Sequence, residues 1–170
     1  DGMTDVSAAG VYLGRSAGFA PCTAEAVTVL LDHYGIDCTG KRAVVIGRSP
    51  VVGRPAAMLL LERNATVTVC HTRTQALSDV TREADIIVSA AGAAGCLTAA
   101  HVRPGQTIID VSTNWDAAKN TIVGDADFDA AASIVDAITP VPGGVGAVTS
   151  TVLMRHVVQA AERTLEGGNL

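Results

Sequence analysis

Aromatic residues and cations are both scarce in this sequence. Only 3% of the 170 residues are Phe, Trp or Tyr. Proteins that hold single-stranded nucleic acid stack its bases on aromatic side chains, and this composition offers few of them. The 12 Lys and Arg residues are outnumbered by 17 Asp and Glu, which gives a net charge of −5. A surface that binds the phosphate backbone is basic, so we expect no nucleic-acid partner.

Long apolar runs and paired cysteines are missing as well. No stretch approaches the roughly 20 apolar residues that span a bilayer, and the start lacks the basic, apolar and small-residue pattern of a signal sequence. We therefore expect no membrane partner and a cytoplasmic protein. The cysteines form no CxxC pair and are interpreted as reduced thiols, and no His, Cys or Asp spacing resembles a metal site. They are Cys22, Cys38, Cys70 and Cys96.

What the sequence does contain is an alternation of short apolar runs with helical segments. Residues 52–63 and 75–83 have helical character, and β-branched runs lie between and around them. Short apolar strands joined by helices are parallel and are connected by right-handed crossovers. The pattern therefore predicts an α/β fold, a Rossmann-like doubly wound parallel sheet. The expected strands are residues 41–46, 66–70, 85–90, 107–111 and 133–139.

The strand ends predict where a ligand binds. In a doubly wound sheet the ligand lies beyond the carboxyl ends of the strands. Four segments then share one rim, and each turns from apolar residues to Gly, Ser, Thr, Arg or Asn. They are residues 47–49, 71–73, 91–95 and 112–114.

The two ends of the chain have helical patterns of their own. Residues 3–15 contain a short helix-like run. A second helix is expected from an N-cap at Thr23 to Tyr34, with Gly35 as its end. Residues 149–165 predict a long amphipathic helix whose apolar face must pack on something, which can lie outside this chain. That face consists of Val152, Leu153, Val157, Ala160 and Ala161.

Residues 47–53 form the first candidate site. The strand KRAVVI runs into the loop GRSPVVG and then into a helix. A helix N-terminus after a glycine turn binds phosphate through free backbone N–H groups. The loop departs from the GxGxxG fingerprint, because Ser49 replaces the middle glycine and Gly53 comes one position late. We predict a pyrophosphate site at Gly47, Arg48, Ser49 and Gly53; the alternative is an ordinary strand-to-helix turn.

The end of the second strand distinguishes between the two nicotinamide cofactors. An NAD site has Asp or Glu there to bind the ribose 2′-hydroxyl, but residues 70–74 read CHTRT. A 2′-phosphate needs hydroxyl and cationic groups instead, and Thr72, Arg73 and Arg48 supply them. We therefore predict NADP as the cofactor. The alternative is that both arginines are solvated surface charges.

The segment TPVPGGVGAVT at 139–149 is too rich in Pro and Gly for the interior of a strand or helix. It is either a rigid turn into the last helix or a loop that lies flat against a planar ligand, where a Cβ would collide. Its PVPGGVG stands in one collinear order with GFAPCTAEAV at 18–27, GRSPVVGRP at 47–55 and ATVTVCHTRT at 65–74. Together these motifs resemble the bifunctional methylenetetrahydrofolate dehydrogenase/methenyltetrahydrofolate cyclohydrolase family along essentially the whole chain.

The resemblance implies an activity and an organisation. The activity is NADP-dependent oxidation of 5,10-methylenetetrahydrofolate, followed by hydrolysis of the methenyl product to 10-formyltetrahydrofolate, in one-carbon metabolism. The organisation is a homodimer with a catalytic domain before the nucleotide domain. Residues 1–20 would then be the end of the catalytic domain with a linker helix, residues 21–146 the NADP-binding domain, and residues 147–170 a helix returning to the catalytic domain.

Matching positions imply roles for individual residues. Asp1 corresponds to the family's aspartate that binds the pterin of the folate. Gly143, Gly144 and Val145 would line the folate pocket. The residues expected at NADP, from the pyrophosphate to the nicotinamide, are Gly47, Arg48, Ser49, Gly53, Thr72, Arg73, Thr113 and Thr149.

The sequence also departs from the family pattern. Ala147 and Val148 replace Pro-Met, and residues 110–115 read DVSTNW in place of DVGINR. The family's catalytic YxxxK motif is absent and would precede Asp1, which suggests a processed or truncated fragment that binds NADP but turns over little. Two alternatives are an NADP-dependent dehydrogenase of another small substrate, of the shikimate type, and a non-catalytic nucleotide-binding module.

Overall fold

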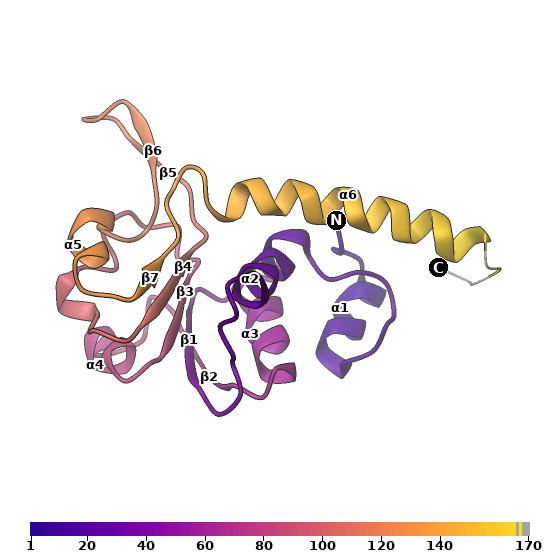
Figure 1. The fold of residues 1–170 in the computed structure, drawn as a ribbon, viewed down its shortest axis with the longest axis horizontal. Helices are drawn as coiled ribbons and strands as arrows, with labels where there is room; N and C mark the ends of the chain where they lie inside the picture. The colour runs from indigo at the N-terminus through magenta and orange to yellow at the C-terminus, as the bar shows by residue number, and fades with distance from the viewer. Residues whose placement is uncertain (166, 168–170) are drawn as a thin grey trace.

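The computed structural model describes residues 1–165 and 167, and its centre is a parallel β-sheet (Figure 1). The strands of this sheet are β1 (Arg42–Ile46), β2 (Thr66–Cys70), β3 (Ile86–Ser89), β4 (Thr107–Asp110) and β7 (Ala137–Ile138). They are arranged in the order β2-β1-β3-β4-β7, and every neighbouring pair is parallel. The chain moves outward from β1 in both directions, which is the arrangement of a doubly wound sheet. The predicted fold class is confirmed.

Helices cover both faces of the sheet. They are α1 (Asp5–Leu13), α2 (Cys22–His33), α3 (Gly53–Glu62), α4 (Leu77–Arg82), α5 (Phe128–Ala132), α6 (Val145–Leu165) and the 3-10 helix η1 (Ala99–His101). Alternate strand residues point to opposite faces. Ala43 and Val45 of β1 pack in one core with α2 and α3, while Val44 and Ile46 pack in the other with residues of α4 and α5. Figure 1 shows these two helical layers on either side of the sheet.

Helix α2 begins at Cys22, so the predicted N-cap at Thr23 is wrong. Pro21 occupies the cap position and offers no side-chain acceptor. The carboxylate of Asp1 takes that role, because its Oδ1 accepts the Cys22 N–H at 2.7 Å. A carboxylate at this end also complements the helix dipole. The helix ends before Gly35, as predicted.

The last predicted strand, residues 133–139, is mostly wrong. Only the two residues of β7 are extended, and α5 occupies the stretch before Ser133. Asp127 caps α5 by accepting the Ala130 N–H at 3.5 Å, and three successive alanines favour helix over strand. The sheet therefore ends in a very short edge strand.

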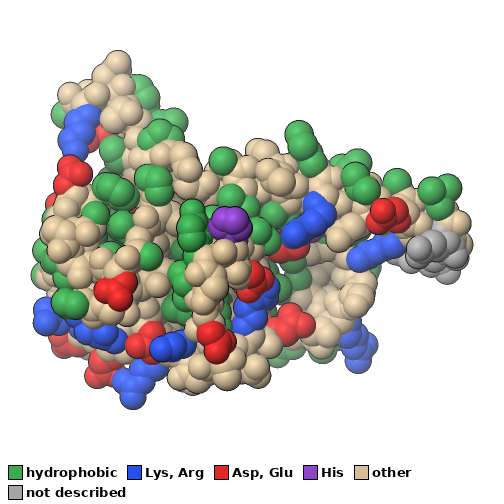
Figure 2. Space-filling view, in the orientation of Figure 1, with side chains coloured by type: hydrophobic (Ala, Val, Ile, Leu, Met, Phe, Trp, Pro, Cys, Tyr) green, Lys and Arg blue, Asp and Glu red, His purple; other side chains and the backbone are tan. Residues whose placement is uncertain are grey.

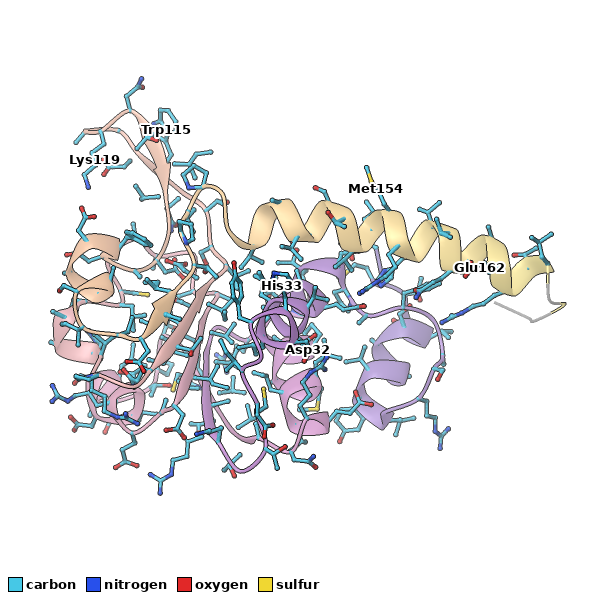
Figure 3. All side chains as sticks on the ribbon, viewed as in Figure 1. Asp32, His33, Trp115, Lys119, Met154 and Glu162 are labelled. Carbon is cyan, nitrogen blue, oxygen red and sulfur yellow. The ribbon has the colours of Figure 1, made fainter. Side chains whose placement is uncertain are left out.

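A β-hairpin that the sequence analysis did not predict projects from the sheet (Figure 1). Its strands, β5 (Asn114–Asp116) and β6 (Thr121–Val123), are antiparallel. The Asp116 carboxylate accepts the N–H of Lys119 at 3.1 Å within the turn. Trp115 and Lys119 lie on this projection (Figure 3), and Trp115 is 65% exposed.

Helix α6 starts at Val145, four residues earlier than expected, and runs for 21 residues over α2 (Figure 1). Its buried residues are Val145, Val152 and His156, whose spacing of seven and four places them on one side. Leu153 and Val157, expected to share a face with Val152, are 43% and 64% exposed. Within this chain Val152 is thus buried while Leu153 and Val157 are not, and the expectation allowed this face a partner outside the chain.

Polar contacts hold α6 to the rest of the chain. Glu25 of α2 forms an ion pair with Arg155 and a hydrogen bond with His156, whose Nε2 lies 2.8 Å from Glu25 Oε2. Farther along the helix, the Arg163 guanidinium lies over the Phe19 ring at 4.3 Å from its centroid. A sequence pattern of apolar residues could not reveal this polar interface.

The outer side of α6 is apolar. Figure 2 shows hydrophobic side chains along its upper edge, and Met154 points away from the domain in Figure 3. Met154 is 70% exposed, and Val158 is 57% exposed. Within the described part of the chain, no helix has both the length and the apolar character needed to cross a membrane.

Candidate functional site

The phosphate loop, residues 47–53, connects β1 to α3 through a close backbone crossing. Gly47 has a φ of 120°, and a Cβ on it would lie 2.2 Å from the Ala90 carbonyl oxygen after β3. A Cβ on Gly53 would lie 2.2 Å from the Gly47 carbonyl oxygen. Both contacts are with backbone, so neither position has room for a side chain. The late glycine therefore lets α3 begin directly against the end of β1.

Ser49, in the place of the usual middle glycine, holds the backbone just before α3, whose N-cap position is Val52. Its Oγ accepts the N–H of Val52 at 3.1 Å and that of Gly53 at 3.4 Å. Among the described residues, the N–H groups of Arg48, Ser49 and Val51 find no acceptor, and all three residues are exposed. Exposed free N–H groups at the start of a helix form an anion site. The loop thus has the donor set that a pyrophosphate requires.

The turn after β2 lies beside this loop, because β2 and β1 are neighbours. The His71 N–H donates to Thr74 Oγ1 at 2.9 Å, and His71 Nδ1 accepts the Arg73 N–H at 3.1 Å. Thr72 and Arg73 remain exposed, and so does Arg48. Neither arginine pairs with an acid in the part of the chain that the structure describes. Two unpaired guanidinium groups and a hydroxyl fit a phosphate group.

A buried carboxylate that the sequence analysis missed connects the ends of β3 and β4. Asp125 is 0% exposed. Its Oδ2 accepts from Ser89 Oγ at 3.0 Å and from the Ala91 N–H at 2.8 Å. Its Oδ1 accepts from the Ala93 N–H at 2.8 Å and from Asn114 Nδ2 at 3.1 Å. The sequence signal was only a Gly-Asp pair after a β-branched run, which is typical of any strand end.

A second carboxyl supports the first. Asp110, the last residue of β4, is 3% exposed and accepts the N–H groups of Asp125 at 3.1 Å and Ala126 at 2.8 Å. Burial raises the pKa of Asp110 to about 6, although its backbone hydrogen bonds act in the opposite direction. Asp110 therefore fixes the backbone that carries Asp125.

The segments after β3 and β4 are also joined directly. Ser112 Oγ accepts the Gly92 N–H at 3.0 Å, and Thr113 next to it is exposed. The four segments predicted at one rim do follow the carboxyl ends of the parallel strands β1, β2, β3 and β4. The predicted rim is confirmed.

The glycine-rich residues 140–146 lead from β7 into α6. Gly143 is exposed, whereas Val145 is 2% exposed and belongs to the core shared with α2. Gly143 and Gly144 border a cleft of about 1110 Å³ between α2 and the β4–β7 edge of the sheet. Thr149 lies one turn into α6, where its hydroxyl donates to the Val145 carbonyl at 3.1 Å.

The strand order spreads the predicted cofactor residues along the rim. The phosphate loop follows β1, Thr72 and Arg73 follow β2 on one side of it, and Thr113 follows β4 on the other side. Asp1 lies at the start of α2, and Gly2 next to it borders a groove that also includes Pro50 of the phosphate loop. Within residues 1–165 and 167, no group of three or more His, Cys, Asp or Glu side chains is placed to hold a metal ion.

Comparisons with known proteins agree with this geometry. Residues 21–165 match the tetrahydrofolate dehydrogenase/cyclohydrolase, NAD(P)-binding domain family. The bifunctional protein FolD of Carboxydothermus hydrogenoformans is 53% identical over 163 residues, which are 95% of this chain and 57% of that protein. The crystal structure of the bifunctional FolD methylenetetrahydrofolate dehydrogenase/cyclohydrolase from Campylobacter jejuni superposes with a TM-score of 0.93 at 43% identity, over 96% of this chain and 58% of that one.

A further solved structure contains the cofactor. The Trypanosoma brucei methylenetetrahydrofolate dehydrogenase-cyclohydrolase, complexed with NADP and an inhibitor, has a TM-score of 0.90 at 38% identity over 97% of this chain and 58% of that one. The chain thus spans a little over half the length of the relatives it matches. The phosphate loop, the turn after β2 and the Asp125 network all lie inside the matched residues. The chain belongs to the NAD(P)-binding domain family of tetrahydrofolate dehydrogenase/cyclohydrolases.

Proposed function

We propose that this chain is the cofactor-binding part of an enzyme that oxidises 5,10-methylenetetrahydrofolate with NADP and hydrolyses the methenyl product to 10-formyltetrahydrofolate. The family membership and the names of the relatives support this activity. The observation that carries the choice of NADP is the pair of free arginines beside a phosphate loop, with no acid in the turn after β2.

The phosphates of NADP would be bound mainly by backbone groups. The N–H groups of Arg48, Ser49 and Val51 face solvent at the positive end of α3, where an anion is stabilised. Thr72 and Arg73 would hold the 2′-phosphate together with the Arg48 guanidinium, because guanidinium groups bind phosphate oxygens in a bidentate way. The glycines at 47 and 53 keep the loop in this shape.

The nicotinamide would supply the redox chemistry by accepting a hydride from the folate. The role of the protein is to place the two reacting groups together, with Thr113 and Thr149 near the ring and with Asp1 and residues 143–145 at the folate. The hydrolytic step needs a proton carrier. The 170-residue sequence contains no Tyr-x-x-x-Lys, so we assign that carrier to a catalytic domain outside this sequence.

We further propose that the chain packs on a catalytic domain and that the assembled protein forms a dimer. Residues 1–20 and helix α6 would pack on the catalytic domain, and the assembled protein would be a cytoplasmic homodimer. The exposed apolar residues along the outer side of α6 support the first part, since a single helix rarely keeps such a row in water without a partner.

Cofactor choice can be tested by calorimetric titration of the 170-residue chain with NADP and with NAD. We expect NADP to bind more tightly. Replacing Arg73 by Ala should weaken NADP binding by about 10-fold or more, the usual effect of losing a charged hydrogen bond, and leave NAD binding unchanged. Arg82→Ala is a matched control, because Arg82 is exposed at the end of α4 and forms no ion pair with a described residue. Equal affinity for both cofactors in the unmodified chain would contradict the proposal.

The activity needs a second assay. A longer protein that joins this chain to its catalytic domain should reduce NADP with 5,10-methylenetetrahydrofolate, and the 170-residue chain alone should bind NADP with little turnover. Comparison with a panel of other hydroxy and amino substrates separates this activity from a dehydrogenase of another class. Near-normal turnover by the chain alone would show that the missing motif is not required.

A further inference from the structure

The carboxylate of Asp125 is surrounded by hydrogen-bond donors and lies away from any cation of the described chain. Besides the four contacts given above, its Oδ2 lies 3.3 Å from the N–H of Gly92. Five donors therefore converge on one fully buried side chain. A buried carboxylate is costly unless it is hydrogen-bonded, and here three of the donors are backbone N–H groups of residues 91–93, which lie outside the helices and strands.

Those segments have a buried side and an exposed side. Ala91, Gly92 and Ala93 donate inward to Asp125, and their residues are exposed at the rim of the sheet. Asn114 adds the start of the hairpin to the same carboxylate. Asp125 thus sets the shape of an exposed backbone surface without reaching that surface itself.

The strand order shows which part of the dinucleotide would meet this surface. The pyrophosphate belongs at the phosphate loop after β1, and the 2′-phosphate belongs at Arg73 after β2. The other half of the molecule must then extend in the opposite direction from β1, over the ends of β3 and β4. That is where residues 91–93 and Thr113 lie.

We propose that Asp125 is a positioning residue for the nicotinamide half of NADP: it holds the backbone of residues 91–93 and Asn114 in the shape that receives that half. The inference rests on the proposed NADP binding and assigns a role to a side chain that the cofactor does not touch. Asp110 acts indirectly, because its carboxylate accepts the backbone N–H of Asp125 and so holds Asp125 in place.

The test compares two ligands on the 170-residue chain. NADP contacts the whole rim, whereas adenosine 2′,5′-bisphosphate contains only the adenosine half with its 2′-phosphate. In Asp125→Asn one oxygen becomes an amino group. If it is Oδ2, Ser89 and Ala91 lose this acceptor while the Gly92 N–H keeps Ser112 Oγ, and if it is Oδ1, Ala93 and Asn114 lose it. We expect the affinity for NADP to fall about 10-fold or more, and that for adenosine 2′,5′-bisphosphate to stay within about twofold, as judged from the hydrogen bonds that each half loses.

Two further variants serve as a control for the change of charge and as a substitute if Asp125→Asn does not fold. Asp129→Asn makes the same change of charge at an exposed position of α5 and should alter neither affinity. If Asp125→Asn does not fold by circular dichroism, Asn114→Ala removes a single donor, and it should lower the NADP affinity selectively by a smaller factor.

Four outcomes would overturn the inference. Equal losses for both ligands would mean that Asp125 only supports the fold, and unchanged affinities would mean that the surface does not need it. If the unmodified chain bound adenosine 2′,5′-bisphosphate but gained nothing from the nicotinamide half, the inference alone would fail. Absence of binding for both ligands would remove the proposed function and this role with it.

Discussion

Gly53→Ala tests the packing of the phosphate loop directly. The added Cβ would lie 2.2 Å from the carbonyl oxygen of Gly47, 2.5 Å from its carbonyl carbon and 2.9 Å from the nitrogen of Arg48. All three atoms are backbone, so they cannot move aside as a flexible side chain would. The helix start must therefore shift away from β1, and the free N–H groups of the loop must shift with it.

The magnitude follows from a comparison with Gly146→Ala in α6. A Cβ on Gly146 meets nothing within 4 Å. Neither glycine has a positive φ, so both variants gain up to about 1 kcal/mol of helix propensity. The gain in helix propensity therefore cancels when the unfolding free energies of the two variants are compared. What remains is the cost of the steric collision at Gly53, typically about 1–3 kcal/mol for an overpacked site. We expect Gly53→Ala to be less stable than Gly146→Ala by this amount.

The assay is urea unfolding of both variants, followed by calorimetric titration of Gly53→Ala with NADP. In a chain of this size each kcal/mol corresponds to about 2–4 °C in Tm, so thermal unfolding gives an independent reading. NADP binding should weaken together with stability, because the same displacement moves the donors. Equal stability of the two variants, with unchanged NADP affinity, would refute the assignment of Gly53 to close packing.

Two further predictions concern the acidic side chains Asp110, which is buried, and Glu25, which is half-buried. The pKa of Asp110 is about 6 in the folded chain against its ordinary value of 3.8, so the folded state holds this proton more tightly than the unfolded state. Its stabilising effect should be complete below about pH 4 and should be lost as the pH rises through 6, by up to about 3 kcal/mol. The difference in unfolding free energy between the unmodified chain and Asp110→Asn should follow that curve, and a difference independent of pH would contradict it. Glu25→Ala should lower the free energy of unfolding by about 1–3 kcal/mol in urea, because it leaves buried His156 without its partner at 2.8 Å. Glu83→Ala, at an exposed position, is the control. If both variants lose the same stability, α6 does not depend on the contact between Glu25 and His156.

The centre of the sheet could be predicted because β1, β3 and β4 are buried on both faces. Such strands are short continuous apolar runs, and β1, β3 and β4 have this character. The tight turn from β1 into α3 was predictable as well, because glycines directly after a strand indicate a close backbone turn. Helices α3 and α4 lie within the residue ranges that the apolar periodicity indicated.

The errors have physical causes in contacts that sequence spacing does not contain. Residues 133–135 have strand propensity, but the alanine-rich stretch before them forms α5 and leaves only two residues for β7. The packing side of α6 depends on Glu25, a polar residue 130 positions away from Arg155. Asp125 was missed because four of its five donors lie 32 to 36 positions earlier, and a lone acid in a turn gives no sign of burial.

The continuity of α6 has a mechanical consequence. Its 21 residues form a rod about 31 Å long, so a tilt of about 5° at Val145 moves the other end by about 3 Å. The helix starts at the end of the glycine-rich segment and extends away from the sheet with its exposed apolar residues. Glu25 contacts it at His156, and Phe19 contacts it at Arg163. A partner that packs on that row and changes the tilt would therefore also displace the glycine-rich segment where the helix begins. The long helix would carry a small rotation at one end to a displacement of several ångströms at the other.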